Sequence, residues 1–208
     1  MVQSLNRLKE SPSQTAGPYI HIGATPNACG IQGVYAEDLG ARLVNAKTIG
    51  QRIVISGRII DGTGAPLRDA LIEIWQADAA GLYPGQGGHR GKLDPDFAGW
   101  GRQAVDSGTG LYRFETIKPG RVPFPDGRPM APHVTIWIVV RGINIGLHTR
   151  LYFGDEAEAN STDPVLARVE HKKWAQTMIA ARSDVAGVAT YTFDIHLQGE
   201  RETVFLDI

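Results

Sequence analysis

Two apolar runs rich in β-branched residues, separated by a tight turn, constrain the fold of this chain most. Residues 53–60 have the composition of a strand, and residues 70–77 form a second apolar run. The sequence Asp61-Gly62-Thr63-Gly64 between them is rich in the residues that turns favour. We therefore expect a strand, a turn and a second strand that pair as a β-hairpin.

Further short strands are expected along the rest of the chain. The apolar run 133–140 and the alternating run 147–153 give the clearest signals, and weaker ones fall at 111–116, 191–197 and 203–207. The proline-rich connection 118–132 predicts a loop that lines a site rather than a core. The expected fold is mostly β, with an antiparallel β-sandwich core formed by residues 51–208.

Helix is expected in two places only. Residues 35–44 show weak helical periodicity within an irregular arm, residues 1–50, that is punctuated by glycine and proline. A more substantial helical region opens at Asp163-Pro164, where an N-cap residue precedes a proline, and continues with interruptions to about residue 182. His148, Arg150 and Tyr152 share one face of the expected strand 147–153, and we assign them no chemistry.

Composition narrows the class of protein and its surroundings. Hydrophobic residues make up 42% of the chain and charged residues 21%, which suits one packed core. The formal net charge of −1, without a basic run, argues against a nucleic-acid or anionic-membrane partner. Cys29 is a lone cysteine, and no stretch has the apolar length of a signal peptide or membrane span. We expect a cytoplasmic protein.

Several motifs along the chain carry a family resemblance. They are Gly57-Arg58-Ile59-Ile60-Asp61-Gly62, Glu73-Ile74-Trp75-Gln76-Ala77-Asp78, Gly81-Leu82-Tyr83, Lys118-Pro119-Gly120, Ala131-Pro132-His133 and Phe193-Asp194-Ile195. Together they resemble the signature of intradiol ring-cleaving dioxygenases. The resemblance covers roughly residues 51–205. The arm sequence Pro12-Ser13-Gln14-Thr15-Ala16-Gly17-Pro18-Tyr19 and the run Arg141-Gly142-Ile143-Asn144-Ile145 further resemble the alpha subunit of a two-chain member of this family.

The resemblance implies a ferric iron held by two tyrosines and two histidines, but this chain keeps only half of that set. Tyr83 and His133 match the first tyrosine and the first histidine, whereas Val122 and Thr135 stand at the other two positions. A His-x-His pair on a strand points both imidazoles to one side, and here the strand reads His133-Val134-Thr135. Valine cannot coordinate a metal and a neutral hydroxyl replaces imidazole poorly. We expect a vestigial site without metal or catalytic residues.

The resemblance also implies a division of labour between two chains. A beta subunit would carry Fe(III), while this alpha chain would supply part of the substrate pocket across a shared interface, its arm 1–50 packing on the partner. The complex, a higher-order alpha–beta oligomer, would use O₂ to cleave a carboxylated catechol between its two hydroxylated carbons. The chain alone would be inactive.

Five residues are predicted to contact the substrate. Arg141, in a turn between two expected strands, is the candidate partner of a substrate carboxylate, because a guanidinium binds carboxylates in a bidentate manner. Thr15, Gly17 and Pro18 form a compact segment in which Gly17 lets backbone approach a planar ring, and Tyr19 is placed to pack alongside.

Purely structural roles for these residues, and two different functions for the chain, are also compatible with the sequence. Tyr83 and His133 can be packed, hydrogen-bonded side chains, and an isolated turn arginine such as Arg141 is more often solvated or ion-paired. A self-sufficient dioxygenase would need replacement ligands, for which Tyr112 and His148 are the nearest candidates. A β-sandwich binding module that has lost the chemistry is the remaining hypothesis, because a fold does not fix a function.

Overall fold

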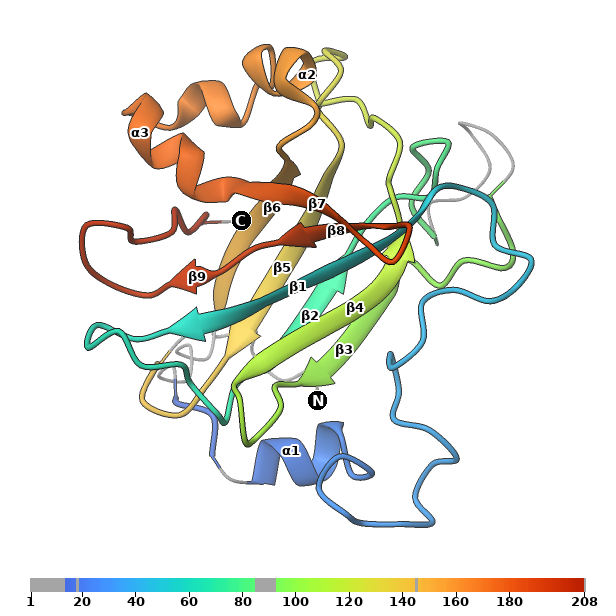
Figure 1. The fold of residues 1–208 in the computed structure, drawn as a ribbon, viewed down its shortest axis with the longest axis vertical. Helices are drawn as coiled ribbons and strands as arrows, with labels where there is room; N and C mark the ends of the chain where they lie inside the picture. Colours follow the sequence, from blue (N-terminus) through green and yellow to red (C-terminus); the bar gives the residue numbers. More distant parts are fainter. Residues whose placement is uncertain (1–13, 18, 85–92, 145, 208) are drawn as a thin grey trace, which may run out of the picture.

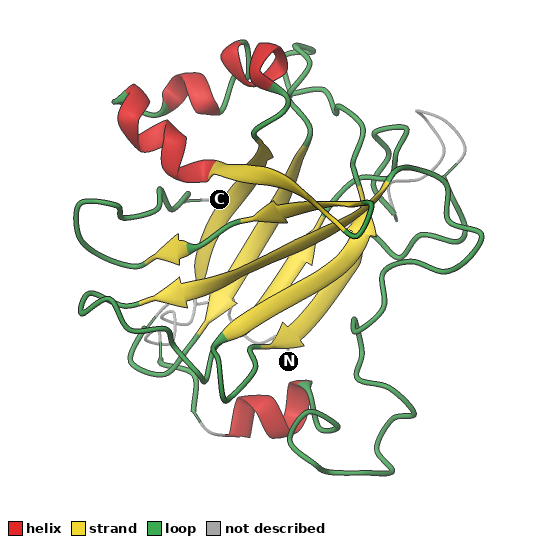
Figure 2. Cartoon of the chain, viewed as in Figure 1, coloured by secondary structure: helices red, strands yellow, loops and turns green. Residues whose placement is uncertain are grey.

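A computed structural model of the protein describes residues 14–17, 19–84, 93–144 and 146–207. Strands dominate it, and the short helices lie at its periphery (Figure 2). The strands are β1 (Arg52–Ile60), β2 (Leu71–Trp75), β3 (Trp100–Ala104), β4 (Leu111–Ile117), β5 (His133–Val139), β6 (Leu147–Phe153), β7 (Ile179–Val185), β8 (Val188–Thr192) and β9 (Ile195–His196). The helical segments are α1 (Tyr19–Ala24), α2 (Ala157–Ser161), η1 (Leu166–Arg168), α3 (Lys172–Ala175) and η2 (Gln176–Met178).

The strands form one hydrogen-bonded path in the order β3-β2-β5-β6-β7-β8-β1-β4, with β9 beside β1. Strand β7 joins two halves of this path, because Ile179 and Ala180 pair with β6 while the residues from Ala181 onward pair with β8. In Figure 1 the half containing β7, β8, β1 and β4 lies in front of the half containing β6, β5 and β2. The mostly β class is confirmed; the sheet is mixed, since β1–β8, β1–β9 and β6–β7 are parallel pairs.

One large hydrophobic cluster holds the two halves together. Ile55 of β1 and Phe114 of β4 belong to the same cluster as Ile72 of β2 and Ile136 of β5, and all four side chains are fully buried. The two ends of the path, β3 and β4, also contact each other. Burial of this apolar surface is the main force that keeps the halves in place.

Alternation along β5 separates the core from the site. Val134, Ile136 and Ile138 are completely buried in the core cluster. Because successive side chains of a strand point to opposite faces, His133 and Thr135 project from the other face of the same strand. The residues that matter for chemistry therefore lie on a face of the sheet turned away from the main core.

The predicted hairpin between the first two strands is wrong, although both strands exist. The turn forms as expected, with Asp61 Oδ1 accepting hydrogen bonds from the backbone N–H groups of Thr63 (2.8 Å) and Ala65 (3.0 Å). However, β1 pairs with β4, β8 and β9, and β2 pairs with β3 and β5. Both strands are interior to the sheet and take neighbours that are distant in sequence, which the local pattern does not encode.

Two helix predictions are wrong. Residues 35–44 contain no helix, because Gly40 adopts a φ of 82° and its carbonyl accepts a hydrogen bond from Arg102 N on β3 (2.9 Å). The arm instead has its helix at α1. The region after Asp163 is three short helical turns rather than one substantial helix, and the chain becomes strand β7 at Ile179 because that strand connects the two halves of the sheet.

The strand expected at 203–207 is also wrong. Among the described residues, the segment makes isolated backbone-to-backbone hydrogen bonds, from Thr203 N to His196 O (2.9 Å) and from Leu206 N to His148 O (2.7 Å). These bonds tie the C-terminal segment to β9 and β6 without building a ladder. Among the described helices, none has both the length and the apolar character needed to cross a bilayer.

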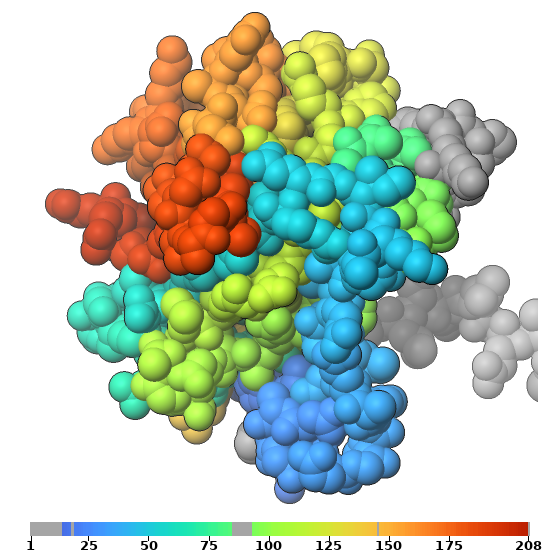
Figure 3. Space-filling view, turned by 45° about the vertical axis from the view of Figure 1, so that its right-hand side comes forward, coloured from blue at the N-terminus to red at the C-terminus, as the bar shows by residue number. Residues whose placement is uncertain are grey.

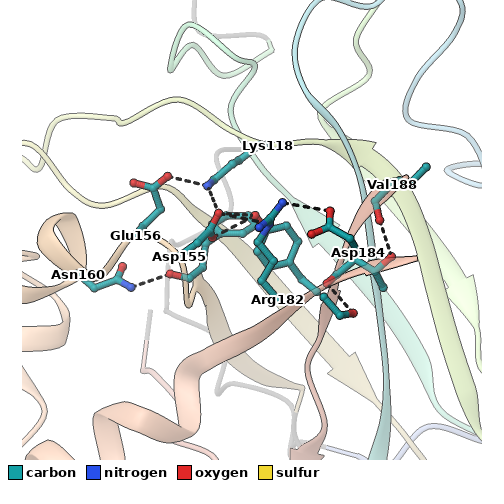
Figure 4. Close-up of polar contacts among 11 residues, drawn as sticks. Lys118, Asp155, Glu156, Asn160, Arg182, Asp184 and Val188 are labelled. Atoms are coloured by element: carbon teal, nitrogen blue, oxygen red, sulfur yellow. Dashed lines mark hydrogen bonds and ion pairs between the residues drawn. The ribbon is translucent and has the colours of Figure 1, made fainter. Parts of the chain in front are cut away.

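A half-buried lysine ties the start of the proline-rich loop to the rest of the sheet (Figure 4). Lys118 Nζ forms ion pairs with Asp155 (2.9 Å) and Glu156 (2.6 Å), in the turn that follows β6. The hydroxyl of Tyr191 on β8 donates to Asp155 at 3.0 Å. Burial lowers the pKa of Lys118, but hydrogen bonds to the two carboxylates outweigh it, so the pKa is raised and the lysine stays charged.

Candidate functional site

Tyr83 and His133, the two predicted ligand positions that keep their residues, meet in the structure. Tyr83 Oη lies 3.4 Å from His133 Nε2, and the His133 side chain is 2% exposed. His133 Nδ1 lies 2.8 Å from the Ala131 carbonyl oxygen, which only accepts, so Nδ1 carries the proton and Nε2 faces the tyrosine. The ring of Tyr83 stacks on Trp75 of β2 with centroids 6.2 Å apart and an interplanar angle of 7°.

Burial keeps this pair neutral. It lowers the pKa of His133 to about 4, and the positive charge of Arg150 also lowers it. The hydrogen bond to the Ala131 carbonyl and the charge of Asp163 raise this pKa, but by less. Burial raises the pKa of Tyr83, and the charge of Arg150 opposes this shift only in part. At neutral pH the pocket thus holds a neutral phenol and a neutral imidazole.

The other two ligand positions supply no metal-binding group. Val122 is 4% exposed and packs in a small apolar cluster with Met130 and Tyr83. Thr135 on β5 lies between two cross-strand partners, Trp75 on β2 and Arg150 on β6. Among the residues that the structure describes, no three His, Cys, Asp or Glu side chains cluster in a way that could hold a metal ion. With Tyr83 and His133 as its two remaining donors, this pocket does not offer the four-residue ligand set that ferric iron has in the family.

Asp163 holds the frame around the pocket. Its fully buried carboxylate accepts hydrogen bonds from Ala131 N (2.8 Å) and from the hydroxyl of Tyr152 (3.2 Å). It also accepts from Val165 N (2.8 Å) and Leu166 N (2.9 Å), which is the capping role that the sequence predicts. By fixing Ala131, it fixes the carbonyl that orients His133.

Sequence reasoning missed Arg150 as a pocket residue. Its place follows from strand register, because β5 pairs with β6 so that His133 faces Tyr152 and Thr135 faces Arg150. The alternating pattern of 147–153 did indicate one polar face, but only the length of the connecting turn would have shown which residues of 133–140 lie opposite it. Asp163 was recognised as a cap, while its long-range partners have no local signal.

The predicted substrate-contact residues Arg141 and Thr15 lie together at the opposite end of the β5–β6 hairpin. Arg141 follows β5, its side chain is 77% exposed, and its Nε lies 3.3 Å from Asp69 Oδ2. Thr15 Oγ1 accepts a hydrogen bond from Gly142 N (2.8 Å) and donates to Val140 O (3.4 Å). The arm is therefore fastened to the turn that carries Arg141.

Gly17 and Tyr19, two of the remaining predicted contact residues, are exposed. Gly17 is exposed, and nothing lies within 4 Å of the position that a Cβ would take. Tyr19, the first residue of α1, is 79% exposed. Pro18 lies outside the described residues. Gly17 and Tyr19 are thus free to contact a molecule other than this chain.

The two ends of the hairpin are far apart. From His133 to Val139, the strand β5 advances six residues, which corresponds to about 20 Å at the rise of an antiparallel strand. In Figure 1 the pocket end of β5 and β6 lies toward α2, and the turn between them lies toward α1. Arg141 therefore cannot act on a molecule bound at Tyr83 and His133 of the same chain.

The two candidates for replacement ligands do not join the pocket. Tyr112 on β4 is buried in the core and its hydroxyl donates to Phe193 O. His148 on β6 pairs with Trp137, two residues along from Arg150. Among the described residues, no hydrogen bond or ring contact links either one to Tyr83 or His133. The geometry gives no support to an alternative iron shell.

Known proteins with similar sequences belong to the family that the motifs of this chain resemble. A family model described as Dioxygenase matches residues 31–199. The protocatechuate 3,4-dioxygenase alpha chain of Pseudomonas putida is 46% identical over 200 residues, which cover 96% of this chain and 97% of that relative. The protocatechuate 3,4-dioxygenase beta chain of Burkholderia cepacia is 36% identical over 187 residues, covering 81% of this chain and 77% of that relative.

The fold has counterparts among solved structures. The 3-chlorocatechol 1,2-dioxygenase of Rhodococcus opacus 1CP superposes with a TM-score of 0.61 at 20% identity, covering 76% of this chain and 65% of that one. At such identity the likeness speaks for the fold alone. The family match includes all four ligand positions and Arg141, whereas Thr15, Gly17 and Tyr19 precede it.

Proposed function

The chain belongs to the intradiol ring-cleaving dioxygenases, a family that uses iron, and we propose that it is the alpha subunit of a protocatechuate 3,4-dioxygenase whose beta subunit holds that iron. The complex cleaves protocatechuate with O₂ between the two hydroxylated carbons, giving 3-carboxy-cis,cis-muconate. This chain contributes binding and orientation of the substrate, and its own pocket takes no part in the reaction.

The observation that carries the proposal is the separation of the two ends of the β5–β6 hairpin. The end with Tyr83 and His133 lacks two ligands, while Arg141 and Thr15 lie about 20 Å away by the rise of the strand. Substrate-binding groups at that distance serve no metal of their own chain. They are useful only if another chain brings its metal to them.

Arg141 is suited to bind the carboxylate of protocatechuate. Its ion pair with Asp69 uses Nε, and no partner is present for its two terminal nitrogens among the described residues. Those nitrogens form a fork that matches a carboxylate in a bidentate manner. Thr15 holds the backbone of Gly142 next to it, which fixes the turn on which the guanidinium stands.

Exposed apolar side chains on the arm support its packing on the partner. The described part of the arm, in blue in Figure 3, lies along the outside of the molecule. Large hydrophobic residues there are accessible although they belong to no core cluster, and such side chains concentrate where proteins bind one another. They are Tyr19 (79%), Ile22 (44%), Ile31 (37%), Val34 (55%), Tyr35 (40%), Leu39 (48%) and Ile49 (70%).

The two parts of the chain thus have different tasks in the proposed complex. The arm 1–50 forms an interface with the beta subunit, and residues 51–208 form the dioxygenase-like domain. Repetition of the alpha–beta pair builds the larger oligomer. The free, exposed Cys29 is compatible with a cytoplasmic location.

The test is reconstitution. Iron content and protocatechuate turnover are measured for this chain purified alone, for a beta chain alone, and for the two mixed. The proposal predicts no bound iron or turnover from this chain alone, and an active iron-bearing complex after mixing. Near-stoichiometric iron with turnover from this chain alone would overturn it, and formation of a complex without turnover would favour a binding module.

A further inference from the structure

Arg150 of β6 lies directly opposite Thr135 of β5, the residue at the position of the family's second histidine. Side chains of opposed residues in an antiparallel pair project from the same face of the sheet. The long side chain of Arg150 therefore extends over the same face as His133 and Thr135, where a metal held by the family's ligand set would sit.

The surroundings of Arg150 place its guanidinium inside the pocket. Its Nη1 lies 3.4 Å from Met130 Sδ, and Met130 packs in the apolar cluster that also contains Val122 and Tyr83. Its Nε is buried and has no hydrogen-bond partner among the described residues. The charge of Arg150 is felt by Tyr83 and His133, on both of which it acts to lower the pKa.

Among the residues that the structure describes, no carboxylate forms an ion pair with Arg150. The nearby carboxylate of Asp163 is already engaged with Ala131, Tyr152 and two further backbone N–H groups. A guanidinium is protonated at every accessible pH and presents only N–H donors. It therefore repels a metal cation and offers it no lone pair.

We infer that Arg150 excludes metal from this pocket, so that the loss of iron in this chain does not rest on Val122 and Thr135 alone. The guanidinium already supplies positive charge to the pocket that contains Tyr83 and His133, where a metal would otherwise bring it. Restoring the missing ligands leaves that charge in place. Iron binding then returns only when the charge is removed as well.

The test restores the missing ligands and compares proteins that differ only at residue 150. Three full-length proteins are prepared that all carry Val122→Tyr and Thr135→His. The first keeps Arg150, the second carries Arg150→Gln and the third carries Arg150→Lys. The unchanged protein is prepared in the same way and gives the background level of bound iron. Ferric iron is added, and bound iron is counted together with the visible absorption of a tyrosinate–iron bond. Because like charges repel strongly in a buried pocket, the Gln protein should bind iron more than about tenfold better than the Arg and Lys proteins.

A second set of variants with a smaller change in the core controls for misfolding. Val122 is tightly packed, so the same comparison is made with Thr135→His alone, where Tyr83, His133 and the new histidine give three ligands. Cooperative thermal unfolding identifies which of the proteins are folded. Equal iron binding with Arg and Gln at residue 150 would overturn the inference. So would folded Gln proteins of both sets that bind no iron.

Discussion

The two ends of the β5–β6 hairpin differ in burial, in bonding and in what they can do. At one end His133 is 2% exposed and is oriented through Ala131 by the fully buried Asp163. At the other end the side chain of Arg141 is 77% exposed and pairs with Asp69, and Thr15 accepts a hydrogen bond from the backbone of the turn. The buried end keeps Tyr83 and His133 at two of the family's four ligand positions, whereas the exposed end carries the candidate partner of a substrate carboxylate.

The hydrogen bonds that hold the pocket in place can therefore persist when metal ligands are replaced. The hydrogen bonds around Asp163 also satisfy buried backbone groups, so losing them costs folding free energy whether or not a metal is bound. Replacing a metal ligand by valine or threonine leaves no buried backbone group without a partner, so it need not lower the folding free energy. Changes at the pocket end should therefore alter stability, and changes at the turn end should alter substrate binding.

The largest effect is expected at Asp163. Asp163→Ala leaves Ala131 N, the Tyr152 hydroxyl and two further backbone N–H groups without an acceptor. The free energy of unfolding, measured by urea denaturation, should fall by about 3–4 kcal/mol. Asp126→Ala, at an exposed ion pair with Arg128, is the matched control and should cost less than about 1 kcal/mol. Similar losses in the two variants would contradict the role of Asp163.

The next effect is a pH dependence due to His133. Its pKa in the folded protein is about 4, below the ordinary value of 6.5, so the unfolded chain binds more protons between these pH values. Its contribution to stability is complete above about pH 6.5 and is lost as pH falls toward 4, a change of about 3 kcal/mol. In His133→Gln this part of the slope should vanish. His171→Gln, at a side chain that is 54% exposed, should keep the wild-type slope.

A smaller, selective effect is expected at Arg141. In the alpha–beta complex, Arg141→Ala should raise KM for protocatechuate about 10–100-fold, because one charged bidentate contact is lost. KM for catechol, which has no carboxylate, should barely change, and neither should the unfolding free energy. Arg113→Ala, at an exposed ion pair on β4, is the control. An equal rise in KM for both substrates would refute pairing with the carboxylate.

The smallest effect is expected at Thr15. Thr15→Val keeps the shape of the side chain but removes the hydrogen bonds to Gly142 N and Val140 O. Looser placement of the turn should raise KM for protocatechuate by about two- to fivefold, because these two neutral hydrogen bonds affect the substrate only through the position of the turn. Thr109→Val, in the β3–β4 turn, should leave KM unchanged. An effect as large as that of Arg141→Ala would mean that Thr15 touches the substrate directly.

The sequence predicted the strands better than their partners. Alternation and β-branched composition located β1, β2, β4, β5 and β6, and a carboxylate before proline located the turns after Asp163. The hairpin of β1 with β2 failed because interior strands choose neighbours through long-range packing. The helix at 35–44 failed because Gly40 bonds to β3 instead.

The same division applies to the site. Tyr83, Val122, His133 and Thr135 were recognised from motif residues, and the structure brings Tyr83 and His133 together. The pairing of Thr15 with the Arg141 turn was compatible with the sequence but not required by it. Arg150 was missed because its importance arises from register across two strands, and no property of residues 147–153 alone reveals it.

The most direct test of the division between the two ends is the iron content and protocatechuate turnover of the alpha–beta complex when this chain carries Tyr83→Phe. The substitution removes the hydroxyl at the one family tyrosine position that the chain retains, 3.4 Å from His133 Nε2. We predict the iron content and turnover of the wild-type complex. Loss of iron or turnover would show that the pocket of this chain takes part in the reaction.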